Sequence, residues 1–244
     1  MGLYFTQHPN ELHGSILELG SGVGLGGCIL SLIINNTMSS YDERKEEKRS
    51  MTLSDINDNV LNMLRQNVTN ALYTTDDISI QKLDWFDYLD TSIQRRTDEN
   101  DTDDDGYDTI IASDCAYLHQ QVVPLANTIS RLLSKKNNRS SKLHMFAPYN
   151  RGVVYELIDE LERKDMHVLV DEIELSKYRI KQQQEMNIGH NNVSSIWNDS
   201  RSSLKEASCC GSKFLHIIAW HKTKEEIDEE RLRRNEDHSM DDID

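Results

Sequence analysis

Acidic side chains stand at the ends of several short apolar runs in this sequence. Glu18 lies inside the first run, Asp55 and Asp84 follow the next two, and Asp114 follows a fourth. If these runs are parallel strands, the carboxylates meet at one edge of a sheet, where open α/β folds bind their ligands. A carboxylate at that edge attracts a cation and accepts hydrogen bonds from hydroxyl or amino groups.

The stretch ILELGSGVGLGG, residues 16–27, is typical of a strand that turns sharply into a helix and lets a ligand approach the backbone. Gly22, Gly24 and Gly27 satisfy the dinucleotide fingerprint, so a nicotinamide or flavin enzyme is one interpretation. Glu18 would then stand beside a pyrophosphate and repel it. S-adenosylmethionine carries a sulfonium and an ammonium but no phosphate. The acid is therefore better explained by this cationic ligand.

Three further residues suit an adenosine group. Asp55 can accept both ribose hydroxyls, as it would for NAD as well. After the third run, Asp84 can accept a hydrogen bond from the exocyclic amine of adenine, and the ring of Trp85 can stack on the base. Each of these two also has a plainer interpretation. Asp84 can be a turn residue or a helix N-cap, and Trp85 can be an ordinary core aromatic.

The fourth run belongs to YDTIIASDCAYLHQ, residues 107–120. It delivers Ser113, Asp114 and Tyr117 to the same edge of the predicted sheet, where a reacting group could be placed. The alternative is that Asp114 caps the helix that follows, but this leaves Tyr117 unexplained.

Apolar and amphipathic segments alternate along the chain, which predicts an α/β fold with a Rossmann-like, doubly wound sheet of seven strands. Helical patterns are expected at about 24–36, 57–71, 118–133 and 151–164. The last two strands have no helical pattern between them, so they are expected to pair antiparallel in an otherwise parallel sheet. The predicted strands are 15–19, 51–55, 78–83, 107–113, 142–147, 167–175 and 213–221.

The length predicts a single domain over residues 1–221, followed by a charged, unstructured tail at 222–244. Polar insertions without apolar periodicity are expected at about 39–50, 95–106 and 181–208. The second contains five aspartates but lacks the flanking helices and the twelfth-position Glu of a calcium loop. We therefore expect no metal site.

The formal net charge of −15 argues against nucleic acid as a substrate, because an acidic chain repels a phosphate backbone. The four cysteines lack metal-site spacing and are expected to be reduced thiols. No run reaches the roughly 20 apolar residues of a membrane span. Met1 to Thr6 fits a myristoylation pattern, but the preferred interpretation is an apolar segment that packs beside the sheet. We expect a monomer in the cytoplasm, with the nucleus also allowed.

Together these residues resemble the class I (seven-strand) S-adenosylmethionine-dependent methyltransferases, in particular the protein-lysine methyltransferases with an Asp-x-x-Tyr motif after strand four. The motif is Asp114 to Tyr117, and Pro148 to Arg151 is similar to a later segment of the family. The resemblance implies that Asp114 and Tyr117 face the methyl acceptor. It also implies a cofactor site made by Glu18, Gly20, Ser21, Gly22, Gly24, Asp55, Asp84, Trp85 and Ser113.

The predicted function is methyl transfer to the ε-amine of an accessible lysine in a protein. Asp114 would orient the amine and stabilise its charge, and Tyr117 would fix the amine by a hydrogen bond. No Asn-Pro-Pro-Tyr-like tetrapeptide follows the fourth strand, which argues against base or amide substrates. A small-molecule N-methyltransferase is one alternative. The other is a catalytically impaired S-adenosylmethionine-binding module with a truncated N-terminus, because only fourteen residues precede Ser15, where family members carry a tryptophan-containing segment.

Overall fold

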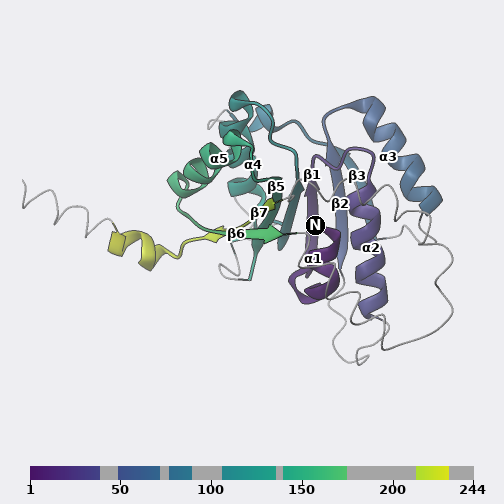
Figure 1. Cartoon of the computed structure of the whole chain (residues 1–244), viewed down its shortest axis with the longest axis horizontal. Coiled ribbons are helices and arrows are strands. Elements are labelled where there is room, and N and C mark those ends of the chain that lie inside the picture. Colours follow the sequence, from purple (N-terminus) through teal and green to yellow (C-terminus); the bar gives the residue numbers. More distant parts are fainter. Residues whose placement is uncertain (39–48, 72–76, 90–105, 136–139, 175–212, 231–244) are drawn as a thin grey trace, which may run out of the picture.

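A computed structural model of the chain describes residues 1–38, 49–71, 77–89, 106–135, 140–174 and 213–230 (Figure 1). The polar insertions expected at 39–50, 95–106 and 181–208 lie almost wholly outside these described residues.

The described residues form one seven-stranded sheet with the strand order β3-β2-β1-β4-β5-β7-β6. Strand β1 pairs in parallel with both β2 and β4, while β7 pairs antiparallel with β5 and β6. The predicted fold class and the single reversed strand are thus confirmed. The strands are β1 Ser15–Leu19, β2 Ser50–Asp55, β3 Ile78–Lys82, β4 Thr109–Ser113, β5 Lys142–Pro148, β6 Met166–Glu174 and β7 Lys213–His221.

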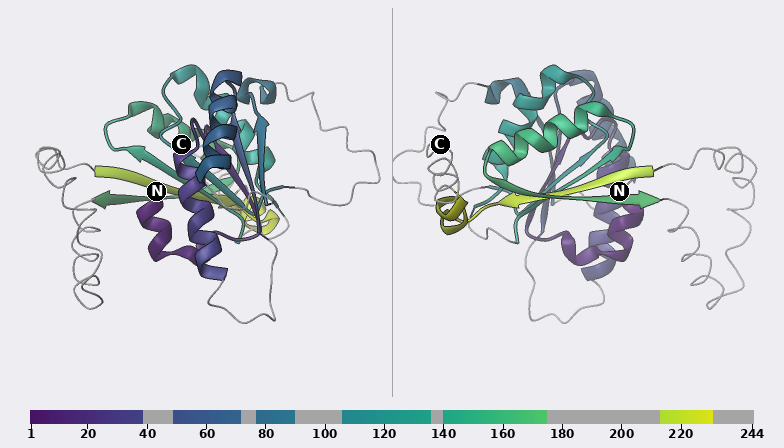
Figure 2. Two further views of the ribbon diagram at one scale, coloured as in Figure 1. Left: turned by 90° about the vertical axis from the view of Figure 1, so that its right-hand side faces the viewer. Right: turned by 60° about the vertical axis from the view of Figure 1, so that its left-hand side comes forward.

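Helices cover both faces of the sheet. Figure 2 shows α1 and α5 on opposite sides of the strands β6 and β7. In the described part of the chain, no helix is long and apolar enough to cross a membrane. The α-helices are α1 Gly2–Gln7, α2 Leu25–Met38, α3 Asp58–Ala71, α4 Val122–Leu132 and α5 Gly152–Arg163.

Helix α3 shows how the sequence specifies these elements. Asn57 Oδ1 accepts hydrogen bonds from the N–H groups of Asn59 at 2.9 Å and Val60 at 3.4 Å, so Asn57 is the N-cap of this helix. The helix then buries apolar residues at three-to-four spacing against the sheet, with Leu61 and Leu64 both almost fully buried. Capping and a single apolar face therefore define this helix.

The N-terminal segment packs beside the sheet, as expected. Phe5 of α1 is fully buried, and its ring centroid lies 5.9 Å from that of Phe146 in β5. The ring of Tyr4 lies 4.3 Å, centroid to centroid, from that of His216 in β7. The helix α1 thus covers the β5 and β7 side of the sheet with aromatic contacts.

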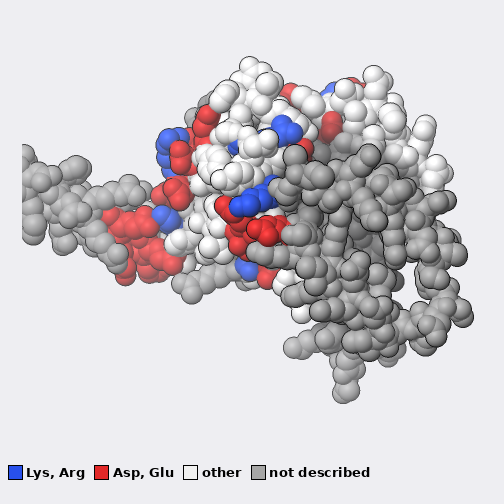
Figure 3. All heavy atoms as spheres, in the orientation of Figure 1, with Lys and Arg blue, Asp and Glu red and all other residues white. Residues whose placement is uncertain are grey.

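The prediction of an unstructured tail needs a correction at its start, because residues 224–230 are helical. Thr223 Oγ1 accepts a hydrogen bond from the Glu226 N–H at 3.2 Å, and Glu226 Oε2 accepts one from the Thr223 N–H at 2.8 Å. This reciprocal capping box starts the helix, and its T-x-x-E signature was legible in the sequence. Figure 3 shows acidic side chains gathered around this segment.

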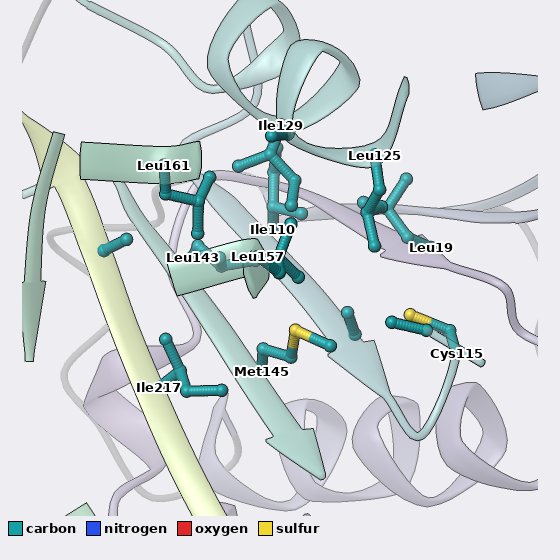
Figure 4. Close-up of a cluster of buried hydrophobic side chains, with 14 of the residues drawn as sticks. Leu19, Ile110, Cys115, Leu125, Ile129, Leu143, Met145, Leu157, Leu161 and Ile217 are labelled. Atoms are coloured by element: carbon teal, nitrogen blue, oxygen red, sulfur yellow. The ribbon is translucent and has the colours of Figure 1, made fainter. Parts of the chain in front are cut away.

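The core lies in two apolar clusters, one on each face of the sheet. Figure 4 shows the cluster beneath α4 and α5, which contains Ile129 of α4, Leu161 of α5, and Leu143 and Met145 of β5. In β1 the alternation of side chains sends Leu17 and Leu19 into this cluster and Ile16 into the other. Burial on both faces keeps the strand ends in place, and those ends carry the polar residues of the site.

Candidate active site

The turn between β1 and α2 begins at Gly20, which has a φ of +63°. The left-handed conformation favours glycine, and a Cβ at this position would also lie only 3.0 Å from the Cβ of Cys115. The N–H of Ser21 donates to the carbonyl of Ser54 at 2.8 Å, which ties the turn to β2. The backbone is therefore held open at the edge of the sheet.

A cavity of about 260 Å³ opens next to this turn, at the carboxyl ends of β1 to β4. This volume lies just below the roughly 300–1,000 Å³ common for ligand sites, so the cavity suits the nucleoside part of a ligand whose remainder extends out of the opening. The lining residues are Gly20, Gly22, Asp55, Ile56, Leu83, Asp84, Trp85, Phe86, Cys115, Tyr117 and Gln121.

Asp55 is held rigidly at the wall of the cavity. Its Oδ2 accepts a hydrogen bond from the Gly22 N–H at 3.1 Å, and its Oδ1 accepts one from the Asn57 N–H at 2.9 Å. Each carboxylate oxygen has a second lone pair, so both can still accept a ligand hydroxyl. The geometry agrees with the expected contact to a ribose diol.

The sequence left open whether Asp84 and Trp85 have a structural role or lie at the ligand site. In the structure both residues have a structural role and also line the cavity. Asp84 Oδ1 accepts a hydrogen bond from the Phe86 N–H at 2.9 Å and caps the 3₁₀ helix Trp85–Tyr88. Asp84 nevertheless also lines the cavity. The partly buried Trp85 packs against the core and lines the cavity near Gly20. Capping and core packing thus place a carboxylate and an indole at the ligand site.

Asp114 follows β4 in a strained backbone conformation, with a φ of +48°. Its N–H donates to the Phe146 carbonyl at 2.8 Å, which ties this position to β5. The next two helical segments are the 3₁₀ helix His119–Gln121, with Leu118 as its N-cap, and α4, with Gln121 as its N-cap. Asp114 therefore does not act as the helix cap that was the alternative. Its carboxylate pairs with Arg151, at 2.8 Å from Nε to Oδ1 and 3.1 Å from Nη2 to Oδ2.

Tyr117 lines the mouth of the same cavity and is 54% exposed. Gln121 Oε1 accepts hydrogen bonds from the N–H groups of Tyr117 and Leu118, both at 3.0 Å, and so fixes this turn. Burial of the phenol raises the pKa of Tyr117, and the negative charge of Asp114 raises it further. The phenol is therefore a neutral hydrogen-bond donor or acceptor at physiological pH.

The structure does not bring Glu18 to the residues that line the cavity. Its side chain is 3% exposed and lies against the first turn of α2, where a Cβ at Gly26 or Gly27 would collide with the carboxylate. Burial raises the pKa of Glu18 to about 7, although hydrogen bonds with the Ser21 side chain and the Gly27 backbone lower it. Within the described residues, Oε2 has no hydrogen-bond partner.

Three other predicted cofactor residues also lie outside the cavity lining. Ser21 Oγ donates to the Glu18 carbonyl at 3.2 Å, and Gly24 comes so close to Leu64 of α3 that no Cβ would fit. Ser113 ends β4 in register with β5. In this structure these residues shape the loop and the strand end, and their direct contact with a cofactor stays a prediction.

The sequence reasoning missed Cys115, Gln121 and Arg151. Cys115 is a buried thiol in the cavity wall, and burial raises its pKa to about 12, so it stays protonated. The sequence indicates Arg151 only as the last residue of the segment 148–151, which is similar to a later segment of the family. It contains no signal for the contact between Arg151 and Asp114. Within the described residues, no cluster of three or more His, Cys, Asp or Glu could hold a metal ion.

The strand order, the glycine turn and the cavity at the strand ends define a class I methyltransferase fold. A model of the family described as "Lysine methyltransferase" matches residues 4–148, which is more than half of the chain. The chain therefore belongs to the lysine methyltransferase family.

Comparisons with individual proteins agree with this assignment. The chain is 24% identical over 173 residues to a calmodulin-lysine N-methyltransferase of Arabidopsis thaliana, and the match covers 69% of this chain and 49% of that protein. The chain thus spans about half the length of this relative.

Two solved structures show the same fold. The YcgJ protein of Bacillus subtilis has a TM-score of 0.50 at 11% identity, covering 91% of this chain and 98% of that one. A ribosomal protein L11 methylase of Lactobacillus delbrueckii subsp. bulgaricus has a TM-score of 0.50 at 12% identity, covering 91% and 77%.

The cofactor of this class of methyltransferases is S-adenosylmethionine. The described residues fit its adenosine part, because Asp55 offers two oriented oxygens and Trp85 offers an aromatic side chain on the cavity wall. The open space at Gly22, where a Cβ would meet no atom within 4 Å, leaves room for a ligand beside the backbone.

Proposed function

We propose that this chain is an S-adenosylmethionine-dependent methyltransferase that methylates the ε-amine of a lysine in a protein substrate. The observation that carries this proposal is that Tyr117 lines the same cavity as Asp55 and Trp85, while Asp114, which is not among the lining residues, is joined to Tyr117 through their shared contact with Arg151. Family membership and the similarity to a calmodulin-lysine N-methyltransferase support lysine as the acceptor.

The reaction needs an aligned, uncharged amine next to the methyl donor. S-adenosylmethionine supplies a methyl group on a sulfonium, whose S–C bond breaks as the N–C bond to the lysine forms. Before this step the lysine ammonium must lose a proton to water. Asp114 would accept a hydrogen bond from an N–H of the amine and so orient the lone pair of the amine nitrogen. Tyr117 would hold the amine by a second hydrogen bond. The protein contributes alignment and electrostatics rather than a strong base, since a carboxylate is weakly basic compared with an amine.

The partner is proposed to be a protein rather than a nucleic acid, because the chain carries a net charge of −15. We also propose that the enzyme acts as a monomer in the cytoplasm or nucleus. Gel filtration with light scattering and imaging of a tagged protein in its host test these two points.

The central test compares wild type with Asp114→Ala, using a cofactor labelled in its methyl group and a host protein lysate. Wild type is expected to place label on lysine, found by mass spectrometry, while Asp114→Ala is expected to lose transfer by at least about 100-fold. Calorimetry should show that Asp114→Ala still binds S-adenosylmethionine, since Asp55 and Trp85 remain. Asp159→Ala, which removes an exposed carboxylate of α5, is the matched control.

Each other outcome has a definite meaning. Full transfer by Asp114→Ala would overturn the role given to this residue. Label on added metabolite amines but on no protein would favour a small-molecule N-methyltransferase. Cofactor binding by wild type without transfer to any protein or amine would favour the impaired S-adenosylmethionine-binding module. Failure of wild type to bind the cofactor at about millimolar concentration, which means binding weaker than about −4 kcal/mol, would overturn the proposed function.

A further inference from the structure

Arg151 contacts both residues proposed to face the methyl acceptor. It is the N-cap residue of α5, directly after β5, and its guanidinium makes the two-pronged pair with the carboxylate of Asp114. The guanidinium carbon also lies 4.5 Å from the centroid of the Tyr117 ring. One cation thus links two side chains that come from the loop after β4.

This arrangement fixes the plane of the carboxylate. Nη2 of the guanidinium donates a hydrogen bond to Oδ2, and Nε stands against Oδ1 as an ion pair; together these contacts restrict rotation of the Asp114 side chain, and lysine, with one nitrogen, cannot occupy both positions. Arg151 Nη2 uses one lone-pair site of Oδ2, whereas Oδ1 is buried and, among the described residues, is met by Arg151 Nε as an ion pair without a hydrogen bond. The Asp114 side chain is 43% exposed, so a second lone pair of Oδ2 can accept a hydrogen bond from an amine that arrives from solvent. Stacking on the Tyr117 ring holds the phenol in place on the same side.

The pair also sets the charge that an acceptor amine meets. An isolated carboxylate stabilises an ammonium, which has no lone pair and cannot attack the methyl group. With Arg151 bound, the Asp114 pair is close to neutral. The other titratable or charged groups near the site are Asp55, Asp84, Cys115 and Tyr117 on the cavity wall, and the His119–Glu156 pair on the turn before α4 and on α5.

We propose that Arg151 is a positioning residue for methyl transfer, which holds Asp114 and Tyr117 in register and favours the uncharged form of the acceptor amine. This inference rests on the proposed lysine methyltransferase function. Arg151 acts through the two side chains that it orients and through its charge.

The test measures kcat and KM for the protein substrate over about pH 7 to 9.5 in wild type, Arg151→Gln and Arg151→Lys. At about pH 7.5, Arg151→Gln is expected to lose about tenfold or more in kcat, with the acid limb of the profile moved up by about one pH unit. The activity of Arg151→Gln should recover as pH rises. At higher pH the acceptor ammonium loses its proton to solvent even without the positive charge of Arg151 beside it. Arg151→Lys should keep the wild-type pH profile, because it keeps the charge, but with a reduced kcat, because it lacks the fork.

Arg163→Gln is the matched control, since it removes an exposed arginine of the same helix that pairs with Glu160. It should leave the profile unchanged. A higher kcat/KM for Arg151→Gln at about pH 7.5 would overturn the proposal and show that Arg151 occupies the acceptor position and must be displaced. A loss that is the same at every pH would also overturn the charge effect.

A second readout does not need turnover. The free energies of unfolding of Asp114→Asn, Arg151→Gln and the double variant form a cycle that reports whether the pair exists in solution. Non-additive effects support the pair, whereas strict additivity overturns it. If wild type methylates no lysine but the cycle is non-additive, the proposed function fails while the Arg151–Asp114 contact stands.

Discussion

Replacing Glu18 with Gln should change how the stability of the protein depends on pH. The Glu18 carboxyl group is almost completely buried between β1 and the first turn of α2, and its pKa is raised to about 7 by burial. In the unfolded chain the same group has the ordinary glutamate pKa of 4.5. Between these two values the folded protein keeps a proton that the unfolded chain has lost, so stability falls as pH rises.

The size of this effect follows from the two pKa values. Each pH unit between the two pKa values lowers the free energy of unfolding by about 1.4 kcal/mol. Integration from about pH 5.5 to about pH 8 gives a loss of about 2 kcal/mol in this free energy from Glu18 alone. Glu18→Gln has no such proton. The difference in unfolding free energy between Glu18→Gln and wild type should therefore shift in favour of the variant by about 2 kcal/mol over this range, or about 4–8 °C in Tm.

Urea unfolding followed by circular dichroism at several pH values measures this difference. Taking the difference between variant and wild type cancels the titration of every other group, including the histidines. Glu162→Gln, which changes an exposed residue of α5, is the control. Its difference from wild type in unfolding free energy should not change with pH. Parallel stability curves for Glu18→Gln and wild type would refute the claim that burial controls this carboxyl group.

The remaining predictions concern the glycine turn and two buried histidines. Gly24→Ala should lower the free energy of unfolding by about 2–4 kcal/mol, because the residue has a φ of +89° and a Cβ would collide with Leu64, as urea titration would show. Gly22→Ala, where a Cβ meets open space, should cost only about 1 kcal/mol in stability but weaken cofactor binding measured by calorimetry. Burial lowers the pKa values of His144 to about 3 and His216 to about 4, so stability should fall as pH drops below about 6.5, where the unfolded chain takes up protons first. His216→Gln should reduce this acid loss, and an unchanged acid slope in the same titration would contradict the assignment.

Local patterns were enough to predict the sheet and the general place of the site. Strands β1 and β7 begin and end at the residues expected from apolar runs, and the lack of a helical pattern before residue 213 correctly predicted the reversed strand. Asp55 and Trp85 reach the cavity because both follow parallel strands, whose carboxyl ends must meet at one edge. These features depend on side-chain period and strand direction, which neighbouring residues encode.

The details of the site depend on contacts between residues far apart in the chain. Glu18 was expected to face the ligand, but it is not among the residues that line the cavity; its carboxyl group is buried against the first turn of α2, and burial raises its pKa. Arg151 meets Asp114 only because β5 lies beside β4, and no spacing along the chain indicates that pair. The order of residues predicts which groups reach the edge of the sheet. Which way each side chain points, and which charge pairs with it, is settled by the packing of whole elements against one another.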